Sequence, residues 1–301
     1  MILLTGGTGF IGKYLRKALM QEYGPDRILV LSSGVVEGCP FLLHHGYSFD
    51  EDYFVRSGYA DIHTIIHAGA YIPKSGAQAN RRKECNGNIY STDQLLSANF
   101  PSLKKIIYLS TVDVYGNADV ISEQSLIQPV SLYGYSKLYC EKMVELLAGA
   151  DSKVCQILRV GHVYGPGEEA YQKIIPATIA RLQNNLSPQI WGTGKEMRSF
   201  IFIDDVIQSI IRSIELASFA GPINIVGSRI ISISTLINEL LGISGLAIPI
   251  EYLPERSARR DLVFDNTRMR DLLKVIETPL SVGLKKEWDY MKTSYPHADI
   301  L

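Results

Sequence analysis

A glycine-rich turn joins a short apolar run to a helical pattern at the start of the chain. The run Met1–Leu4 leads into TGGTGFIG at Thr5–Gly12, and helical periodicity continues over Phe10–Glu22. Glycine at this GxxGxxG spacing permits a tight turn, a close approach of the backbone to a pyrophosphate and close packing of helix on strand, while the helix N-terminus offers N–H groups to phosphate. We therefore expect a dinucleotide to contact Gly6, Gly9, Phe10, Ile11 and Gly12.

The residues that end the second apolar run bear on which dinucleotide binds. Ile28–Leu31 is followed by Ser32 and Ser33, at the place where an acidic side chain usually binds the ribose 2′-hydroxyl of NAD. Two uncharged hydroxyls do not repel a 2′-phosphate, yet no Arg follows them to bind it. The sequence allows NAD or NADP as cofactor and slightly favours NADP.

Short apolar runs alternate with longer helical patterns through the first half of the chain. Runs rich in Ile, Val and Leu predict a buried parallel sheet, and the helical intervals predict its crossovers. We expect strands at Met1–Leu4, Ile28–Leu31, Ile62–His67, Ile106–Ser110 and Val154–Arg159, and helices at Phe10–Glu22, Glu84–Ala98 and Gly134–Ala148. This pattern predicts the α/β class, a doubly wound parallel sheet or Rossmann fold.

The rhythm changes after Tyr164–Gly167, where the elements become shorter and charged loops appear at Lys195–Arg198 and Glu255–Asp261. We expect a dinucleotide-binding Rossmann domain over residues 1–164, to which 200–226 return. A smaller C-terminal substrate-binding domain is expected from 165–199 and 227–301, over the carboxyl edge of the sheet. The tail from Asp261 to Leu301 is predicted to be helical.

Composition argues against several kinds of partner. A net charge of −1 gives no electrostatic basis for binding nucleic acid or an anionic membrane surface. No segment reaches the roughly 18 uninterrupted apolar residues of a membrane span, and a strand that begins at Met1 leaves no room for a signal peptide. The four cysteines are scattered without metal-ligand spacing, so we expect reduced thiols, no metal site and a cytoplasmic protein.

A tyrosine and a lysine four residues apart, Tyr133 and Lys137, share one face of an expected helix. An ammonium favours a nearby phenolate and lowers the tyrosine pKa from about 10, which suits proton transfer to or from a substrate oxygen. With 17 Tyr in the chain, the spacing alone is expected about once by chance. Its position carries the argument, because Ser110 and Thr111 end the preceding strand and the Thr111 hydroxyl is placed to orient the substrate oxygen.

Further motifs follow in order along nearly the whole chain. They are HAGA at His67–Ala70, NIYST at Asn88–Thr92, LSTVDVYG at Leu109–Gly116, YGYSK at Tyr133–Lys137, LRVGHVYGP at Leu158–Pro166 and GTGKEMRSFIFIDDV at Gly192–Val206. Together with the glycine turn they resemble the extended short-chain dehydrogenase/reductase family, in its nucleotide-sugar epimerase, dehydratase and reductase branch.

The resemblance implies roles for individual residues. Thr111, Tyr133 and Lys137 fall on the catalytic positions, with Lys137 also expected on the nicotinamide ribose. Arg198 and Arg260 are expected to bind the substrate's diphosphate, because a planar guanidinium binds phosphate oxygens in pairs; adjacent Arg259 is an alternative to Arg260. Beyond the glycine turn, the expected cofactor contacts are Ser32, Ser33, Ala68, Gly69, Ala70, Tyr133, Lys137, Val160 and His162. The expected substrate contacts are Thr111, His162, Arg198 and Arg260.

The chain departs from the family pattern in three segments. Dehydratases of this branch carry Asp-Glu directly after the catalytic threonine, where this chain has Val112 and Asp113. Val112 cannot transfer a proton, so the dehydratase interpretation loses its acid. His162 replaces the family's Asn, and Tyr47 replaces the Asp that usually follows the third strand, which puts the adenine contacts there in doubt.

The resemblance implies an NAD(P)-dependent nucleotide-sugar 4-epimerase or 4-keto-sugar reductase, with hydride and proton transfer at C4. The alternatives are a nucleotide-sugar 4,6-dehydratase, a non-sugar alcohol dehydrogenase and a non-catalytic NADP sensor. An NADPH requirement would favour reduction, since cells keep that cofactor reduced. The expected partners are a nucleotide-diphosphate sugar and a second copy of the chain, in a homodimer through a four-helix bundle formed by Glu84–Ala98 and Gly134–Ala148.

Overall fold

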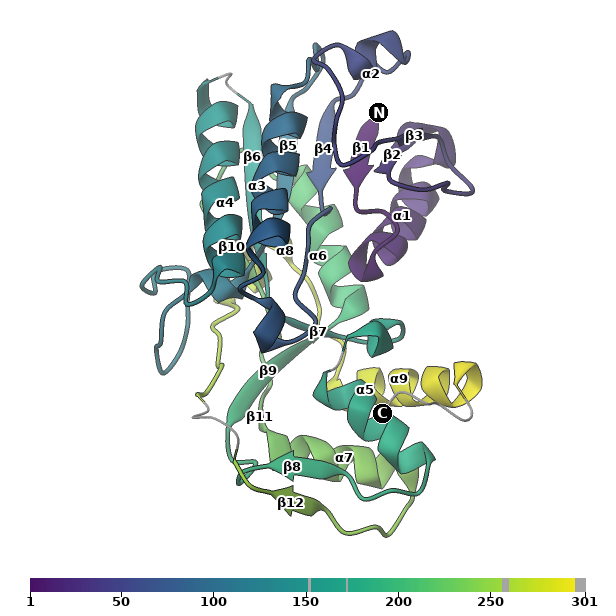
Figure 1. Ribbon diagram of the computed structural model, residues 1–301, viewed down its shortest axis with the longest axis vertical. Coiled ribbons are helices and arrows are strands. Elements are labelled where there is room, and N and C mark those ends of the chain that lie inside the picture. The colour runs from purple at the N-terminus through teal and green to yellow at the C-terminus, as the bar shows by residue number, and fades with distance from the viewer. Residues whose placement is uncertain (151–152, 172, 256–259, 296–301) are drawn as a thin grey trace.

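A parallel sheet of seven strands forms the centre of the part that the computed structural model describes, which comprises residues 1–150, 153–171, 173–255 and 260–295 (Figure 1). Its strands are β1 (Ile2–Thr5), β2 (Ile28–Ser32), β3 (Phe41–Leu43), β4 (Thr64–His67), β5 (Lys105–Thr111), β6 (Val154–Val160) and β10 (Ile223–Ile225). Their order across the sheet is β10-β6-β5-β4-β1-β2-β3. Ile, Leu and Val dominate these strands, as burial on both faces of a parallel sheet requires.

The strand order reverses between β1 and β4. The chain runs outward from β1 through β2 to β3, and then returns to β4 on the other side of β1. In an open parallel sheet such a switch point leaves a crevice at the carboxyl ends of the strands, where ligands bind. The residues that follow β1 and β4, the glycine turn and Ala68–Ala70, therefore meet at this crevice.

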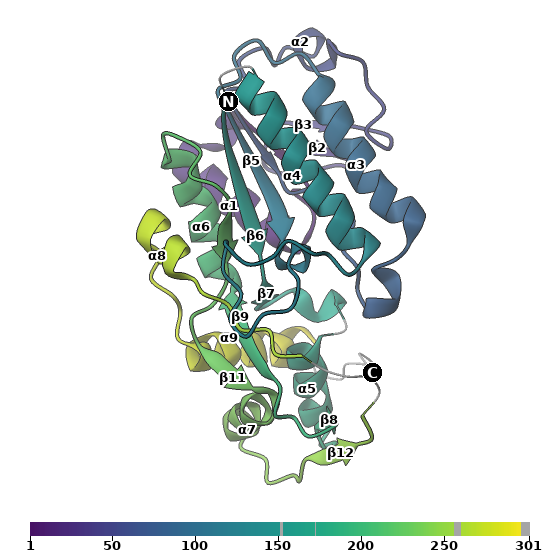
Figure 2. The same ribbon diagram turned by 90° about the vertical axis from the view of Figure 1, so that its left-hand side faces the viewer.

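Helices cover both faces of the sheet. Helices α3 (Arg82–Ser97) and α4 (Leu132–Ala150) pack side by side on one face, and α1 (Phe10–Tyr23) and α6 (Ile203–Glu215) pack on the other (Figure 2). The other α-helices of the described part are α2 (Tyr53–Arg56), α5 (Ile174–Gln183), α7 (Ile233–Ser244), α8 (Thr267–Leu273) and α9 (Leu280–Ser294).

Shorter elements gather beyond the carboxyl edge of the sheet. A mixed sheet joins β7 (His162–Tyr164), β9 (Met197–Phe202) and β11 (Ile230–Ser232), and a parallel pair joins β8 (Gln189–Trp191) to β12 (Glu251–Leu253). Helices α5, α7 and α9 pack around these strands (Figure 1).

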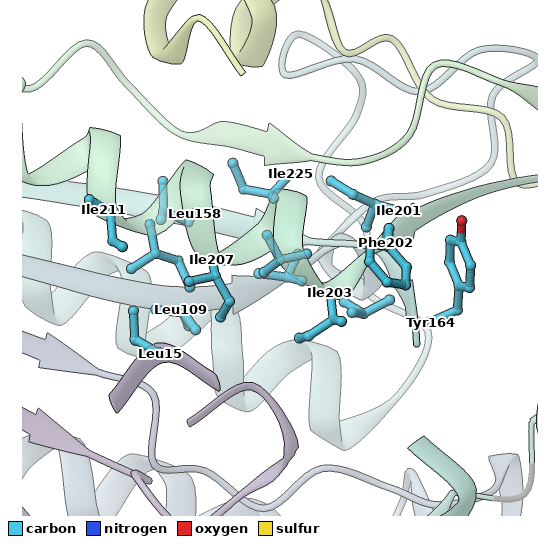
Figure 3. Packing of buried hydrophobic residues seen from close by; sticks show 14 of the residues in the cluster. Leu15, Leu109, Leu158, Tyr164, Ile201, Phe202, Ile203, Ile207, Ile211 and Ile225 are labelled. Atoms are coloured by element: carbon cyan, nitrogen blue, oxygen red, sulfur yellow. The ribbon is translucent and has the colours of Figure 1, made fainter. Parts of the chain in front are cut away.

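One hydrophobic core runs from the central sheet into the smaller group of elements. Figure 3 shows Leu158 of β6 and Ile207 of α6 in the same cluster as Phe202 of β9 and Tyr164 of β7. Each such side chain contributes about 1.5–3 kcal/mol when it is fully buried. The two groups of elements therefore share their stabilising contacts.

A buried ion pair fixes α4 against the sheet. Arg159 of β6 donates to both carboxylate oxygens of Glu141 on α4, at 3.0 and 2.7 Å, and Ser110 of β5 donates to the same carboxylate. Both charged side chains are almost completely buried. Since unpaired charges are costly inside a protein, this pairing selects one position of α4 relative to the ends of β5 and β6.

The predicted strands and helices of the first half are present within a few residues of their expected bounds. The short edge strand β3 was not anticipated, because Phe41–Leu43 is half exposed and follows a proline. Residues 200–226 do not all return to the central sheet: residues 200–202 belong to β9 in the mixed sheet, α6 packs on the central sheet and only β10 joins it. Likewise β7, within the expected Rossmann domain, pairs with β9.

The helical tail expected from Asp261 to Leu301 is correct only in part. Leu262 and Phe264 form isolated bridges to other segments before α8 begins, and a non-helical stretch separates α8 from α9. Residues 296–301 lie outside the described residues.

Backbone packs directly on backbone at the glycine turn. A Cβ atom on Gly12 would lie 1.9 Å from the carbonyl oxygen of Gly6, and one on Gly6 would lie 2.6 Å from the backbone nitrogen of Gly69. Gly6 also has a φ of +71°, which favours glycine. Gly9 is different, because a Cβ there would be 3.4 Å from its nearest neighbour and φ is −73°.

We expect Gly12→Ala to lower the free energy of unfolding by about 1–3 kcal/mol or more, since helix α1 must move away from β1 to admit the methyl group. Gly9→Ala is the matched control and should change stability little, because alanine fits this backbone conformation and loses less entropy on folding. Urea unfolding followed by circular dichroism measures both. Equal midpoints for the two variants would contradict the packing argument.

Candidate active site

The first pocket lies at the switch point between β1 and β4 and has a volume of about 360 Å³. Of the predicted cofactor contacts, Gly6, Ser32, Ser33, Gly69 and Ala70 line it. Helix α3 forms the opposite wall. The remaining predicted residues of the glycine turn, Gly9, Phe10, Ile11 and Gly12, begin helix α1, whose N-cap Gly9 has no side-chain cap. The first N–H groups of α1 are thus without a capping side chain, as an anion-binding helix end requires.

A chain of hydrogen bonds supports this pocket. Thr92 donates to the Asn88 carbonyl, so its oxygen accepts from His67 Nε2 at 3.1 Å and leaves His67 Nδ1 to accept from Thr5 at 2.7 Å. Thr5 in turn accepts from the N–H of Gly69 at 2.9 Å. Burial lowers the pKa of His67 to about 3, so the ring is neutral and this tautomer persists. These hydrogen bonds tie the ends of β1 and β4 to helix α3.

Tyr47 lies beside this series of hydrogen bonds. Its hydroxyl is within hydrogen-bonding reach of Thr5 and lies where a Cβ on Gly69 would be, and its ring lies 4.2 Å from that of His44. With φ at +61°, Tyr47 holds a backbone conformation that a bulky residue rarely adopts. Sequence reasoning identified Tyr47 only as a departure and missed His67; a histidine directly before the AGA turn was the available signal.

The predicted catalytic tyrosine and threonine face each other at the carboxyl end of β5. Tyr133 lies in the first turn of α4, and its phenol is close enough to the Thr111 hydroxyl for this group to influence its pKa. Helix and strand approach closely because residue 134 is glycine: a Cβ there would lie 2.5 Å from the Asp113 carbonyl oxygen. Burial, and then the charge of Asp113, raise the pKa of Tyr133. The expected lowering of this pKa is therefore wrong, because desolvation of the buried phenolate raises it instead.

Lys137 lies one helical turn further along α4 and is almost completely buried. Its ammonium sits 4.3 Å from the ring centre of Tyr108, and no carboxylate of the described residues forms an ion pair with it. Burial lowers the pKa of Lys137 to about 8. Its three N–H donors suit hydroxyl oxygens brought by a ligand.

A second pocket, of about 230 Å³, lies between the carboxyl edge of the sheet and α5. The predicted residues His162 and Arg198 line it together with Glu168 and Lys173, and Val160 lies at the end of the adjoining strand β6. Burial lowers the pKa of His162 to about 4, and its Nδ1 is buried without a hydrogen-bond partner. His162 is therefore a neutral ring that presents a polar atom.

Arg260 does not line either pocket but adjoins the second one. Its carbonyl accepts from the Arg198 guanidinium at 2.7 Å, and its own guanidinium donates to Asn117. Burial raises the pKa of Asp113, and the charge of Arg260 opposes this rise. Arg260 thus lies between Arg198 and the catalytic end of β5. The alternative, Arg259, lies outside the described residues.

The described residues include neither a membrane-spanning helix nor a metal-binding cluster. None of their helices has both the length and the apolar character to cross a membrane. They contain no group of three or more His, Cys, Asp or Glu side chains that could hold a metal ion.

Comparison with known proteins places these features in a family. The model of the NAD dependent epimerase/dehydratase family matches residues 2–226. The chain is 30% identical over 238 residues to dTDP-D-glucose 4,6-dehydratase of Dictyostelium discoideum, an alignment that covers 69% of this chain and 54% of that protein. The chain thus spans about half the length of that relative.

Two solved structures resemble the fold along almost its whole length. UDP-glucuronic acid 4-epimerase from Bacillus cereus, in complex with UDP-glucuronic acid and NAD, has 27% identity and a TM-score of 0.83, covering 98% of this chain and 99% of the other. UDP-glucose 4-epimerase from Thermotoga maritima, with UDP-glucose, has 27% identity and a TM-score of 0.85, covering 97% and 99%. The predicted extended short-chain dehydrogenase/reductase fold is confirmed, and the chain belongs to the NAD dependent epimerase/dehydratase family.

Proposed function

We propose that the protein is an NAD-dependent nucleotide-sugar 4-epimerase. The observation that carries this proposal is the arrangement of three residues at the end of β5: Thr111 ends that strand, Tyr133 lies in the first turn of α4, and the buried Lys137 lies one turn further along. None of the three lines either of the two pockets. The first pocket has the glycine turn of a dinucleotide site, and the second has an arginine suited to phosphate. Both similar structures described above are UDP-sugar 4-epimerases.

The described residues fit the cofactor that the family implies. The close contact of Gly12 with Gly6 leaves no Cβ between α1 and a pyrophosphate at its N-terminus. Lys137, buried without a carboxylate partner, is placed to donate to the nicotinamide ribose. Ala68 and Ala70 flank Gly69 at the end of β4 and form the small-residue edge of the site. When bound, NAD supplies the acceptor for a hydride from C4 and the donor that returns it.

Tyr133 would move the matching proton. It takes the proton of the C4 hydroxyl as the hydride leaves C4, so that a 4-keto sugar forms, and gives it back to the carbonyl oxygen as the hydride returns to the other face. Thr111 holds that oxygen in line with the phenol. Val112 offers no acid for removal of water, and this observation disfavours the 4,6-dehydratase alternative.

The second pocket supports a nucleotide-diphosphate sugar as the substrate. Arg198 brings a guanidinium to its lining and Arg260 adjoins it, and both suit the diphosphate. The unpartnered Nδ1 of His162 is an acceptor for a ligand N–H or O–H group. A non-sugar alcohol has no diphosphate that these guanidinium groups could bind.

A 4-keto-sugar reductase is the second candidate. The raised pKa of Tyr133 favours the protonated phenol, which is the form that a reductase needs in order to protonate a carbonyl oxygen. The two functions differ in their use of cofactor, since an epimerase regenerates its cofactor in every cycle and a reductase releases it oxidised.

The lining of the first pocket supports NAD rather than the NADP slightly favoured by the two serines. Among the described residues that line it there is no Arg or Lys, and Glu84 is the acidic one. A 2′-phosphate at Ser32 and Ser33 would meet hydroxyls but no cation.

We expect mass spectrometry of the purified, denatured protein to release NAD, and NADP to bind the emptied protein at least roughly tenfold more weakly, the value of one missing charge-assisted contact. Equilibrium dialysis measures both affinities. Tightly retained NAD supports the epimerase. Empty protein that consumes NADPH with a 4-keto sugar would instead establish the reductase.

We expect Tyr133→Phe to lower kcat for UDP-sugar epimerisation by roughly 10²–10⁴-fold, the usual contribution of a general acid–base group, with NAD affinity unchanged. Tyr135→Phe is the matched control, since Tyr135 is an exposed residue two positions along the same helix. Unchanged biological activity of Tyr133→Phe with intact cofactor binding would favour the non-catalytic sensor.

The outer surface of α3 and α4 supports a homodimer. Tyr135, Tyr139 and Leu146 follow one stripe along α4 and are 54%, 56% and 71% exposed, and Tyr90 of neighbouring α3 is 48% exposed. A contiguous apolar surface on two adjacent helices favours a second copy that adds two more helices. A cytoplasmic location stays a prediction from the sequence.

We expect sedimentation velocity to give a dimer for the wild-type protein and a monomer for Leu146→Glu, since a charge at the centre of an apolar interface remains unpaired. Val282→Glu places the same charge on α9, where Val282 is 45% exposed, and should leave the dimer intact. A monomeric wild-type protein at all concentrations tested would refute the four-helix interface.

A further inference from the structure

The ammonium of Lys137 lies over an aromatic ring inside the protein. Its Nζ is 4.3 Å from the centre of the Tyr108 ring, a distance at which the negative face of an aromatic ring attracts a cation. Tyr108 belongs to β5 and Lys137 to α4, and their exposed fractions are 1% and 3%. Because water is nearly excluded from both side chains, the attraction between them is weakly screened.

The ring of Tyr108, rather than its hydroxyl, makes this contact. The hydroxyl is buried and has no hydrogen-bond partner among the described residues. The thiol of Cys140, in the same hydrophobic cluster, donates instead to the Asn88 carbonyl at 3.5 Å. Burial raises the pKa of Tyr108 well above its usual value, so the side chain stays neutral and cannot attract Lys137 as a phenolate. A phenylalanine could therefore make the same contact.

Glu141, one turn further along α4 than Lys137, is a carboxylate whose charge favours the ammonium. Its oxygens are already occupied, since Arg159 donates to both of them and Ser110 donates to one. The pairing of Glu141 with a guanidinium reduces its attraction for a second cation. Glu141 therefore does not replace the direct contact of Lys137 with the ring.

The remaining titratable groups around Lys137 are neutral. His67 of β4, whose ring lies 5.7 Å from that of Tyr108, has its pKa lowered by burial to about 3. Among the buried residues of α3, all within the described part, Cys85 alone is titratable, and burial raises its pKa. Burial also raises the pKa of Tyr133, one turn back on α4. The Tyr108 ring is thus the main attraction that the described residues offer this ammonium.

We propose that Tyr108 is a positioning residue, whose ring face keeps Lys137 in its ammonium form beside the cofactor site. The assignment rests on the proposed function, in which Lys137 donates to the nicotinamide ribose. A carboxylate partner would accept the N–H groups of the lysine. A ring face attracts the charge and leaves N–H groups for the oxygen atoms of a ligand.

The need for such an attraction follows from the burial of Lys137. Burial lowers the pKa of Lys137 to about 8, close to physiological pH. The ring attracts the ammonium but not the neutral amine, so it opposes this lowering. Without the ring, much of the lysine would lose its proton at physiological pH.

The decisive variant is Tyr108→Leu, which removes the ring but keeps an apolar side chain. Tyr108→Phe keeps the ring and removes only the unpartnered hydroxyl. Phe54→Leu is the matched control, because it removes a fully buried ring from a different hydrophobic cluster. NMR of the full chain containing lysine labelled with ¹³C at Cε measures the pKa of Lys137, and Lys137→Met identifies its signal.

We expect Tyr108→Leu to lower the pKa of Lys137 by about 1, the size of a desolvated attraction between a cation and a ring. Tyr108→Phe and Phe54→Leu should leave this pKa close to its wild-type value, although Phe54→Leu also weakens a core. The inference is overturned if Tyr108→Leu leaves the pKa unchanged, or if Tyr108→Phe lowers it as far as Tyr108→Leu does.

The affinity for NAD as a function of pH gives a second reading. Since the ammonium is the form that suits the ribose, the affinity of the emptied protein should fall as pH rises through the pKa of Lys137. In Tyr108→Leu the fall should begin about one pH unit lower, so that NAD binds roughly tenfold more weakly at about pH 9 and almost equally well at about pH 6. A loss by the same factor at every pH would indicate a change of shape alone and would overturn the proposal.

Should Tyr108→Leu fail to fold, phenylalanines with one, two or three ring fluorines at position 108 keep the shape of the ring and weaken its negative face in steps. The pKa of Lys137 should fall along this series, and a constant pKa would overturn the inference. A protein that shows these shifts but binds neither NAD nor NADP would refute the proposed function and leave the effect of Tyr108 on Lys137 standing.

Discussion

The direct packing of Gly12 on the carbonyl of Gly6 is the contact on which the rest of the site depends. It places the first turn of α1 at the carboxyl end of β1, because any side chain there would separate helix from strand. The packing of Gly6 on Gly69 then brings the end of β4 to the same point. Thr5 and His67 join these two strand ends by hydrogen bonds, and Thr92 connects them to α3. This one backbone contact thus helps to position the crevice of the fold, one wall of the first pocket and the N-terminus of α1.

The catalytic end of the cleft contains charged and polar groups in a costly state. Lys137 is buried and forms no ion pair with a carboxylate of the described residues, and Tyr133 is buried in the first turn of the same helix. Burial alone opposes ionisation of both residues. Hydroxyl groups of a ribose and a sugar would satisfy these donors and acceptors. Ligand binding would then remove part of the free-energy cost of burying them. Buried ionisable groups with shifted pKa values are common at sites that transfer protons.

Much of the fold could be predicted because short segments of the sequence carry the signals for individual strands and helices. Runs such as Ile106–Ser110 are apolar on both faces, and glycine and YxxxK patterns follow strands at the edge where ligands bind. The edge strand β3 escaped prediction since Phe41–Leu43 is short and half exposed. The mixed sheet escaped because β7, β9 and β11 pair across long separations in the chain.

The finer properties of the site depend on contacts that no spacing reveals. The pKa of Tyr133 is raised chiefly by its burial, which the spacing of tyrosine and lysine in the sequence does not reveal. The position of Arg260 relative to Arg198 follows from a bridge between Arg198 and Leu262. His67 and Asp113 lie within recognised motifs, but their partners are set by the meeting of strands and helices distant in sequence. The motif residues can therefore be recognised in the sequence, whereas their contacts depend on the fold.

The short connection between β6 and β7 bears on the length of ligand that the site can accept. The chain leaves the central sheet at Val160 and enters the mixed sheet at His162, with Gly161 alone between them and packed against Val226. Arg198 lies on β9, paired with the neighbours of that same segment. Arg198 and Tyr133, to which we assign anion binding and proton transfer, are thus held on one continuous framework rather than on two hinged bodies. The fold fixes the distance between these two residues. The site we propose would therefore favour a ligand whose charged group and reacting carbon are separated by a matching distance.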